Sequence, residues 1–106
     1  MDPVVVVLTT LPDQATALKL ADTLIQERLA ACVNILPAMT SVYEWKGKHE
    51  RGQEHLLLIK TPKGRYRDLE ACILRMHPYE LPEIIALPVE TGLSAYLDWV
   101  GAQTSA

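Results

Sequence analysis

The sequence predicts an α+β fold, in which a four-stranded antiparallel sheet is covered on one face by two helices. Short β-branched and aliphatic runs, typical of strands, alternate with two stretches whose apolar residues recur at three- and four-residue spacing, typical of helices. A polar segment flanked by glycines separates the two middle strands, as in a hairpin. The resulting order, β-α-β-β-α-β, is the signature of a ferredoxin-like fold.

The first strand is predicted over residues 4–8, where four valines precede a leucine. Residues 9–13 should end this strand, with Thr10 or Asp13 as the cap of the helix that follows. The helix is expected to end near Ala30. Its apolar face is predicted from helical spacing to consist of Leu18, Ala21, Leu24, Ile25 and Leu29.

The two middle strands are predicted to form a long hairpin. The second strand begins at residue 32, is bent or bulged at Pro37, and resumes over residues 40–45, where Tyr43 and Trp45 share one face. Residues 46–52 are the expected polar tip and residues 54–61 the returning strand. Strands of this length would project beyond the sheet. Because projecting edges need a partner, we expect an oligomer.

The second helix is predicted over residues 65–76, ending before Pro78. A last strand over residues 83–89 and a short terminal helix over residues 93–102 complete the chain. The inner face of the second helix is expected to carry Tyr66, Leu69, Ile73 and Met76. With no internal linker, residues 1–106 are expected to form a single domain.

Composition argues against several classes of protein. The apolar share of 49% is enough for a core, whereas the net charge of −3 argues against a nucleic-acid or membrane binder. No apolar run approaches the length of a membrane-spanning helix, and no signal peptide opens the chain. Cys32 and Cys72 lack disulfide or CxxC patterns, so we expect buried free thiols in a reducing cytoplasm.

Residues 76–85 contain several polar side chains that are suited to binding a ligand or a metal ion. Here His77, Tyr79, Glu80 and Glu83 lie around two prolines that stiffen the backbone. Such a helix-to-strand connection holds side chains in place and often carries functional residues. Two prolines can equally well do no more than end a helix and start a strand, and the residues alone leave both interpretations open.

Five blocks of the chain resemble the CutA divalent-cation-tolerance family. These are residues 29–34 (Leu-Ala-Ala-Cys-Val-Asn), 43–47 (Tyr-Glu-Trp-Lys-Gly), 59–61 (Ile-Lys-Thr), 77–84 (His-Pro-Tyr-Glu-Leu-Pro-Glu-Ile) and 96–99 (Tyr-Leu-Asp-Trp). The resemblance implies a ferredoxin-like protomer and a cytoplasmic homotrimer whose long hairpins pair between subunits. It also implies copper binding and a part in tolerance of divalent metal ions.

The resemblance further implies a set of metal-binding positions. Copper ligation in the family is attributed to a cysteine at the end of the first strand and to two consecutive histidines that close the second helix. Those positions match Thr9, Met76 and His77 here, and only His77 keeps the ligand type. Met76 offers a thioether suited to Cu(I) but also fits the core stripe, while a threonine hydroxyl is a poor ligand for soft metals.

A second candidate site is a cleft between subunits. Its expected residues are Tyr43, Trp45, Lys60, Tyr79 and Glu83. Such a cluster could bind a small anion or a metal, or could simply lock the oligomer together. An alternative function is therefore that of a trimeric module resembling the PII regulators. Such a module would bind a small ligand or a partner in intersubunit clefts, without a dedicated metal site. Since no catalytic motif is present, we expect no enzymatic activity.

Overall fold

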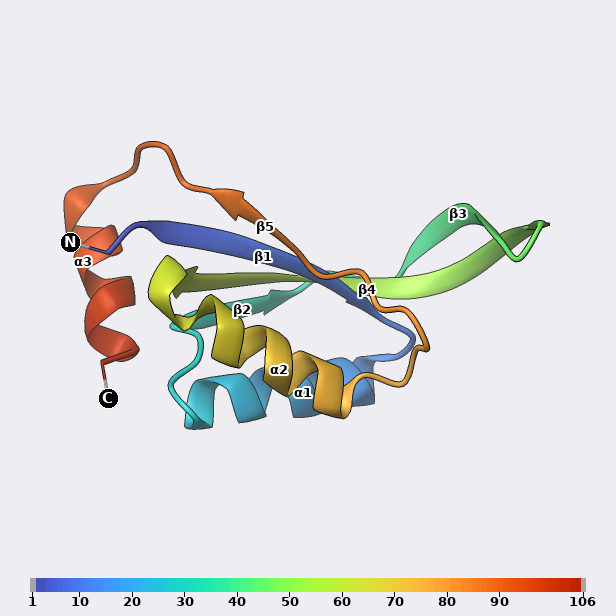
Figure 1. The fold of residues 1–106 in the computed structure, drawn as a ribbon, viewed down its shortest axis with the longest axis horizontal. Helices are drawn as coiled ribbons and strands as arrows, with labels where there is room; N and C mark the ends of the chain where they lie inside the picture. Colours follow the sequence, from blue (N-terminus) through green and yellow to red (C-terminus); the bar gives the residue numbers. More distant parts are fainter. Residues whose placement is uncertain (1, 106) are drawn as a thin grey trace.

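A computed structural model describes residues 2–105 and contains the predicted α+β architecture (Figure 1). The sheet has strand order β2-β4-β1-β5, and β3 pairs with the outer part of β4. All pairings are antiparallel. Met1 and Ala106, the two ends of the expected domain, lie outside the described residues. The strands are β1 (Val4–Leu11), β2 (Cys32–Ile35), β3 (Met39–Trp45), β4 (Lys48–Pro62) and β5 (Ile85–Pro88); the helices are α1 (Gln14–Gln26), α2 (Tyr66–Met76) and α3 (Ser94–Gln103).

The first helix begins and ends for clear local reasons. The Asp13 carboxylate accepts a hydrogen bond of 2.8 Å from the Thr16 backbone N–H, which makes Asp13 rather than Thr10 the N-cap. The helix ends at Gln26, four residues before the predicted Ala30. Arg28 has a φ of 57°, a left-handed conformation that no helix continues through.

The buried face of α1 differs from the predicted one. Leu18 and Ile25 are 49% and 43% exposed, so their assignment to the inner face was wrong. The helix instead buries the positions just before them, Ala17 and Leu24. The stripe consists of Ala17, Leu20, Ala21 and Leu24.

The hairpin is longer and its turn tighter than predicted. β4 already begins at Lys48, so the turn consists of Lys46 and Gly47, with φ values of 52° and 79°. Positive φ at both central residues is typical of a type I′ turn, whose twist matches that of paired strands. The hairpin extends well beyond the helices (Figure 1). β2 and β3 are the two parts of the strand that Pro37 was expected to interrupt.

One face of the sheet is packed and the other is not. Val7, Leu57 and Ile59 point toward α1 and α2 and are fully buried, as are Leu69, Cys72 and Ile73 of α2. Successive side chains of a strand point to opposite faces. Figure 1 shows both helices on one side of the sheet, with α3 at its end. The opposite side, called the open face below, is formed by Val6, Leu8, Cys32, Asn34, Leu56, Leu58, Lys60, Ile85 and Leu87.

The last helix is held against the body of the protein by its C-terminal carbonyls. Arg65 donates from Nε and Nη2 to the Thr104 carbonyl at 3.0 and 2.7 Å, and Arg28 donates to the Gln103 carbonyl at 3.3 Å. Two cations at a helix C-terminus complement its dipole. α3 is thereby fixed beside the end of the open face, where Tyr96 and Trp99 stay about two-fifths exposed.

Candidate functional site

His77 lies just past the end of α2, and both nitrogens of its ring make hydrogen bonds. Its backbone is extended because Pro78 follows it. The ring Nε2 donates to the Thr10 carbonyl at 2.7 Å, and Nδ1 accepts from the Tyr79 backbone N–H at 3.1 Å. Since Nδ1 is an acceptor here, the imidazole is neutral with its proton on Nε2. Burial lowers the pKa of His77 and favours this state, against opposing effects of the Thr10 hydrogen bond and the Glu54 charge.

Tyr79 extends this contact to the base of the projecting hairpin. Its ring lies 4.8 Å from that of His77, and its hydroxyl donates to Glu54 Oε2 at 2.8 Å. Burial raises the pKa of the Glu54 carboxyl, but hydrogen bonds from Ser41, Tyr79 and Thr10 outweigh it, so the pKa lies below its ordinary value. Burial and the Glu54 carboxylate raise the pKa of the Tyr79 phenol. We call Thr10, Glu54, His77 and Tyr79 the His77 network.

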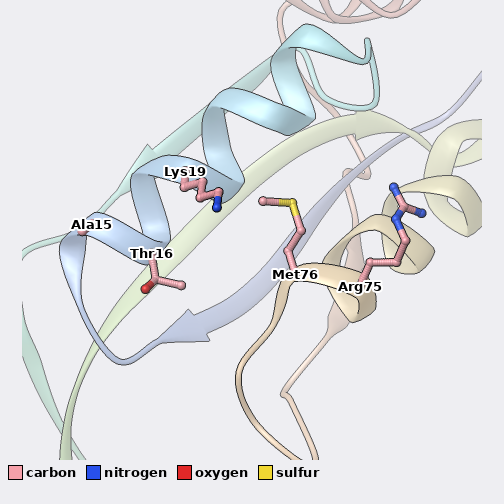
Figure 2. Close-up of a pocket in the computed structure, with 5 residues that line it drawn as sticks. All are labelled: Ala15, Thr16, Lys19, Arg75 and Met76. Carbon is pink, nitrogen blue, oxygen red and sulfur yellow. The ribbon is translucent and has the colours of Figure 1, made fainter.

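Met76 is partly packed against the core and also lines a surface groove. The groove has a volume of about 510 Å³ and lies between the start of α1 and the end of α2. Figure 2 shows the Met76 side chain and the Lys19 side chain extending toward each other, while Arg75 points away. Met76 therefore packs against the core and also lines the groove. The Lys19 ammonium lines the same groove from α1.

Thr9 lies in the core and its hydroxyl has no hydrogen-bond partner within the described residues. The side chain is fully buried, opposite Leu57 in the sheet. A buried hydroxyl without a partner costs about 1–3 kcal/mol. Thr61, on the same face of the sheet, differs because its hydroxyl donates to the Leu29 carbonyl at 2.7 Å.

These two threonines give a matched test of the packing around Thr9. We expect Thr9→Val to raise the free energy of unfolding by about 1–2 kcal/mol, because the orphaned hydroxyl is removed without loss of volume. Thr61→Val should lower it by about 1–2 kcal/mol, because the Leu29 carbonyl loses its donor. Urea denaturation at fixed protein concentration measures both. A loss of stability in Thr9→Val would show that the hydroxyl is satisfied in solution.

The three family-equivalent metal positions do not fit a copper site within one chain. The Thr9 hydroxyl is buried in the core, and the ring nitrogens of His77 are both in hydrogen bonds. The Met76 thioether lies on a groove that also holds the Lys19 ammonium, a charge that repels cations. Within residues 2–105, no group of three His, Cys, Asp or Glu side chains is placed to hold a metal ion.

The residues of the predicted cleft divide into two places. Tyr43 and Trp45 are exposed on β3, on the same side of the hairpin as Glu54, and Tyr79 reaches this side through its hydrogen bond. Glu83 is exposed in the loop before β5. Lys60 is not with them. It lies six residues along β4 from Glu54, about 20 Å away at the rise of a strand.

Lys60 instead belongs to a polar cluster that the sequence did not predict. It donates to Asn34 Oδ1, which also accepts from the Cys32 thiol at 3.8 Å. Tyr96 of α3 lies beside Cys32, and burial together with this thiol raises the pKa of its phenol. Cys32 was expected to be buried but is partly exposed, because it points to the open face. The only signal in the sequence is that blocks 29–34, 59–61 and 96–99, which carry the family resemblance, all contribute to this cluster.

Comparison with known families confirms the resemblance. Residues 5–103 match the family model described as CutA1 divalent ion tolerance protein. The chain belongs to this family. It is 46% identical over 99 residues to the divalent-cation tolerance protein CutA of Thermus thermophilus, and the match covers 93% of this chain and 96% of that protein. A match to protein CutA of Homo sapiens is 47% identical over 91 residues, covering 86% of this chain but only 51% of the human protein. The chain thus spans nearly all of the Thermus relative and about half of the human one.

Solved CutA structures share the fold. The Thermus thermophilus structure has a TM-score of 0.89 at 46% identity, covering 92% of this chain and 94% of that one. CutA1 from Oryza sativa has a TM-score of 0.95 at 41% identity, covering 98% and 95% of the two chains. The fold of this chain is therefore the ferredoxin-like fold of CutA1 structures. A relative from Archaeoglobus fulgidus, 32% identical with a TM-score of 0.93 over 96% of this chain and 99% of that one, is described as a periplasmic divalent cation tolerance protein.

Proposed function

We propose that this CutA-family protein works as a cytoplasmic homotrimer in the response to divalent metal ions, and that it has no catalytic role. The open face of the sheet is the observation that carries the oligomeric part of this proposal, and membership of the divalent-cation tolerance family supports the part about metal ions. Of its apolar residues, Ile85 and Leu87 are 46% and 48% exposed, and Leu8 and Leu58 beside them are only half-buried. An exposed apolar patch of this kind is typical of a surface that another subunit covers. None of the helices within residues 2–105 is long and apolar enough to cross a membrane.

The projecting hairpin supports assembly into a closed ring. β3 and the outer half of β4 pair only with each other within the described chain, so both of their outer edges are free. Free edges pair readily with another chain. Because the hairpin extends beyond the body of its own protomer, it can meet a neighbour. A repeated head-to-tail contact closes into a ring when the rotation between neighbours divides a full turn, and the proposed trimer is such a ring.

We further propose that the site in this assembly is a cleft for a small ligand or a partner, without a dedicated copper site. Tyr43 and Trp45 lie on the outer part of the hairpin, on the side that Tyr79 reaches through Glu54 at its base, and a neighbouring subunit would add a second wall there. Glu83, exposed in the loop before β5, would join this cleft from a subunit of the assembly. Both ring nitrogens of His77, which would be the metal ligands, are in hydrogen bonds within the chain, and the Thr9 side chain is fully buried. Copper binding through His77 and Met76 is the alternative that the family resemblance implies.

Copper titration distinguishes a cleft without a dedicated copper site from copper binding through His77 and Met76. We expect calorimetry to show only weak, sub-stoichiometric Cu(II) binding by the wild type, and His77→Ala should leave that binding unchanged. His49→Ala is the matched control, since it removes an exposed histidine of the hairpin instead. Tight binding of one copper per chain that His77→Ala abolishes and His49→Ala retains would establish the dedicated site and contradict this proposal.

A further inference from the structure

The polar cluster on the open face has more hydrogen-bond donors than acceptors. Asn34 Oδ1 is the acceptor for both the Lys60 ammonium and the Cys32 thiol. Among the side-chain hydrogen bonds of residues 2–105, two N–H groups of Lys60 and the NH₂ of Asn34 have no acceptor. The Tyr96 hydroxyl lies at the edge of the cluster beside Cys32. Such an arrangement lacks a negatively charged acceptor.

The charge of Lys60 is not paired with a carboxylate in either salt bridge of residues 2–105. The two salt bridges found within residues 2–105 join Lys46 to Glu80 and Arg75 to Glu27, so neither involves Lys60. In the register of the sheet, Lys60 lies between Cys32 and Val6, with Leu87 next along the row. The ammonium therefore lies among apolar and neutral side chains, on a chain whose net charge is −3.

We propose that Lys60, Asn34 and Tyr96 form a binding site for a carboxylate or a similar small oxyanion on the open face. A planar carboxylate accepts from the Lys60 ammonium and the Asn34 NH₂ at once, and charge-assisted bonds of this kind are about twice as strong as neutral ones. Lys60 itself is half-buried, so water screens its charge less than that of a fully exposed lysine.

The carboxylate has two sources that share this chemistry. One is a free anion, such as a dicarboxylate metabolite or phosphate. The other is an acidic side chain of a second copy, which would reach the site if the open face is covered as proposed above. The inference deepens the proposed function by naming the ligand chemistry of this face, and it rests on that function only for the second source.

The test measures anion binding and assembly separately. Succinate and inorganic phosphate are titrated into the ¹⁵N-labelled full chain at constant ionic strength, and the side-chain NH₂ signals of Asn34 are followed by NMR. Sedimentation measures the mass of the same samples. Lys60→Met keeps the aliphatic stem and removes the charge. Lys63→Met is the matched control, because Lys63 is exposed, changes the net charge equally and lies outside the open face.

If the anion is free in solution, the Asn34 signals shift saturably with succinate or phosphate, and Lys60→Met weakens binding at least about tenfold while Lys63→Met does not. Asn34→Asp should also abolish binding, because it places a carboxylate beside Lys60 within the chain. If the acid comes from a second copy, neither probe binds the wild type, and Lys60→Met weakens self-association at least about tenfold. If no anion shifts the Asn34 signals and Lys60→Met leaves self-association unchanged, the proposed site is wrong. A monomeric wild type that still binds succinate through Lys60 would overturn the trimer and leave the site standing.

Discussion

The double variant Ile85→Arg/Leu87→Arg is expected to be a monomer at concentrations where the wild type is fully assembled. Both side chains are nearly half exposed on the open face of the isolated chain, so arginine fits there without disturbing the fold. Once a second subunit covers this face, the two guanidinium groups would lose their water. An unpaired buried charge costs several kcal/mol, so two of them in each subunit should prevent assembly.

The outer helices provide a matched control for this variant. Leu18 and Leu74 are 49% and 54% exposed on α1 and α2, on the opposite side of the protein. Leu18→Arg/Leu74→Arg makes the same change of charge and hydrophobicity and should keep the oligomeric mass of the wild type. Light scattering after size exclusion compares the two, with circular dichroism to confirm that both are folded. Two variants that assemble equally well would show that the open face is not the interface.

Acidification is expected to destabilise the protein in two steps, both through the His77 network. The pKa of His77 in the folded protein lies below its ordinary value of 6.5, so the unfolded chain takes up a proton first as the pH falls. This contribution to stability is complete above about pH 6.5 and is lost as the pH falls toward the lowered pKa. Glu54 gives the second step. Its pKa in the folded protein lies below the ordinary value of 4.5, so its contribution to stability is lost as the pH falls from about 4.5 through the pKa of the folded protein.

Protonated His77 could not keep its present contacts, because Nδ1 would carry a hydrogen facing the Tyr79 N–H. We therefore expect His77→Gln, which does not titrate, to flatten the upper step, and Glu54→Gln to flatten the lower one. Urea midpoints from pH 7.5 to 4 at fixed protein concentration measure both, since unfolding of an oligomer depends on concentration. A profile in which His77→Gln leaves the upper step unchanged would assign that step to other groups.

The sequence predicted the elements where local patterns and tertiary packing agree. The two helices, the split strand at Pro37 and the burial of Cys72 were predicted correctly because periodicity and proline geometry act locally. The inner face of α1 was wrong, because Leu18 and Ile25 have the right spacing for a stripe one position away from the one that packs. Only the approach of the helix to the sheet decides between neighbouring stripes, and this depends on residues far away in the chain.

The residues of the candidate site could be predicted from the sequence, but the hydrogen bonds between them could not. His77 and Tyr79 stood out because two prolines stiffen the backbone around them. Their hydrogen bonds to Thr10 and Glu54 join segments 67 and 25 residues apart, which no spacing rule reveals. The neighbours of Lys60 within its own chain could not be predicted for the same reason. Its contact with Asn34 depends on the register of β2 against β4.

The mass of the wild-type protein in solution tests the central claim most directly, namely that the open face and the hairpin of one chain are covered by two further copies. With a chain mass of 11.8 kDa, sedimentation equilibrium at micromolar concentration should give a single species of three times that mass, about 35 kDa. A species of 11.8 kDa would contradict the account, because the apolar open face would then be exposed to water. A stable dimer would contradict it as well, since a two-fold contact does not close the head-to-tail ring.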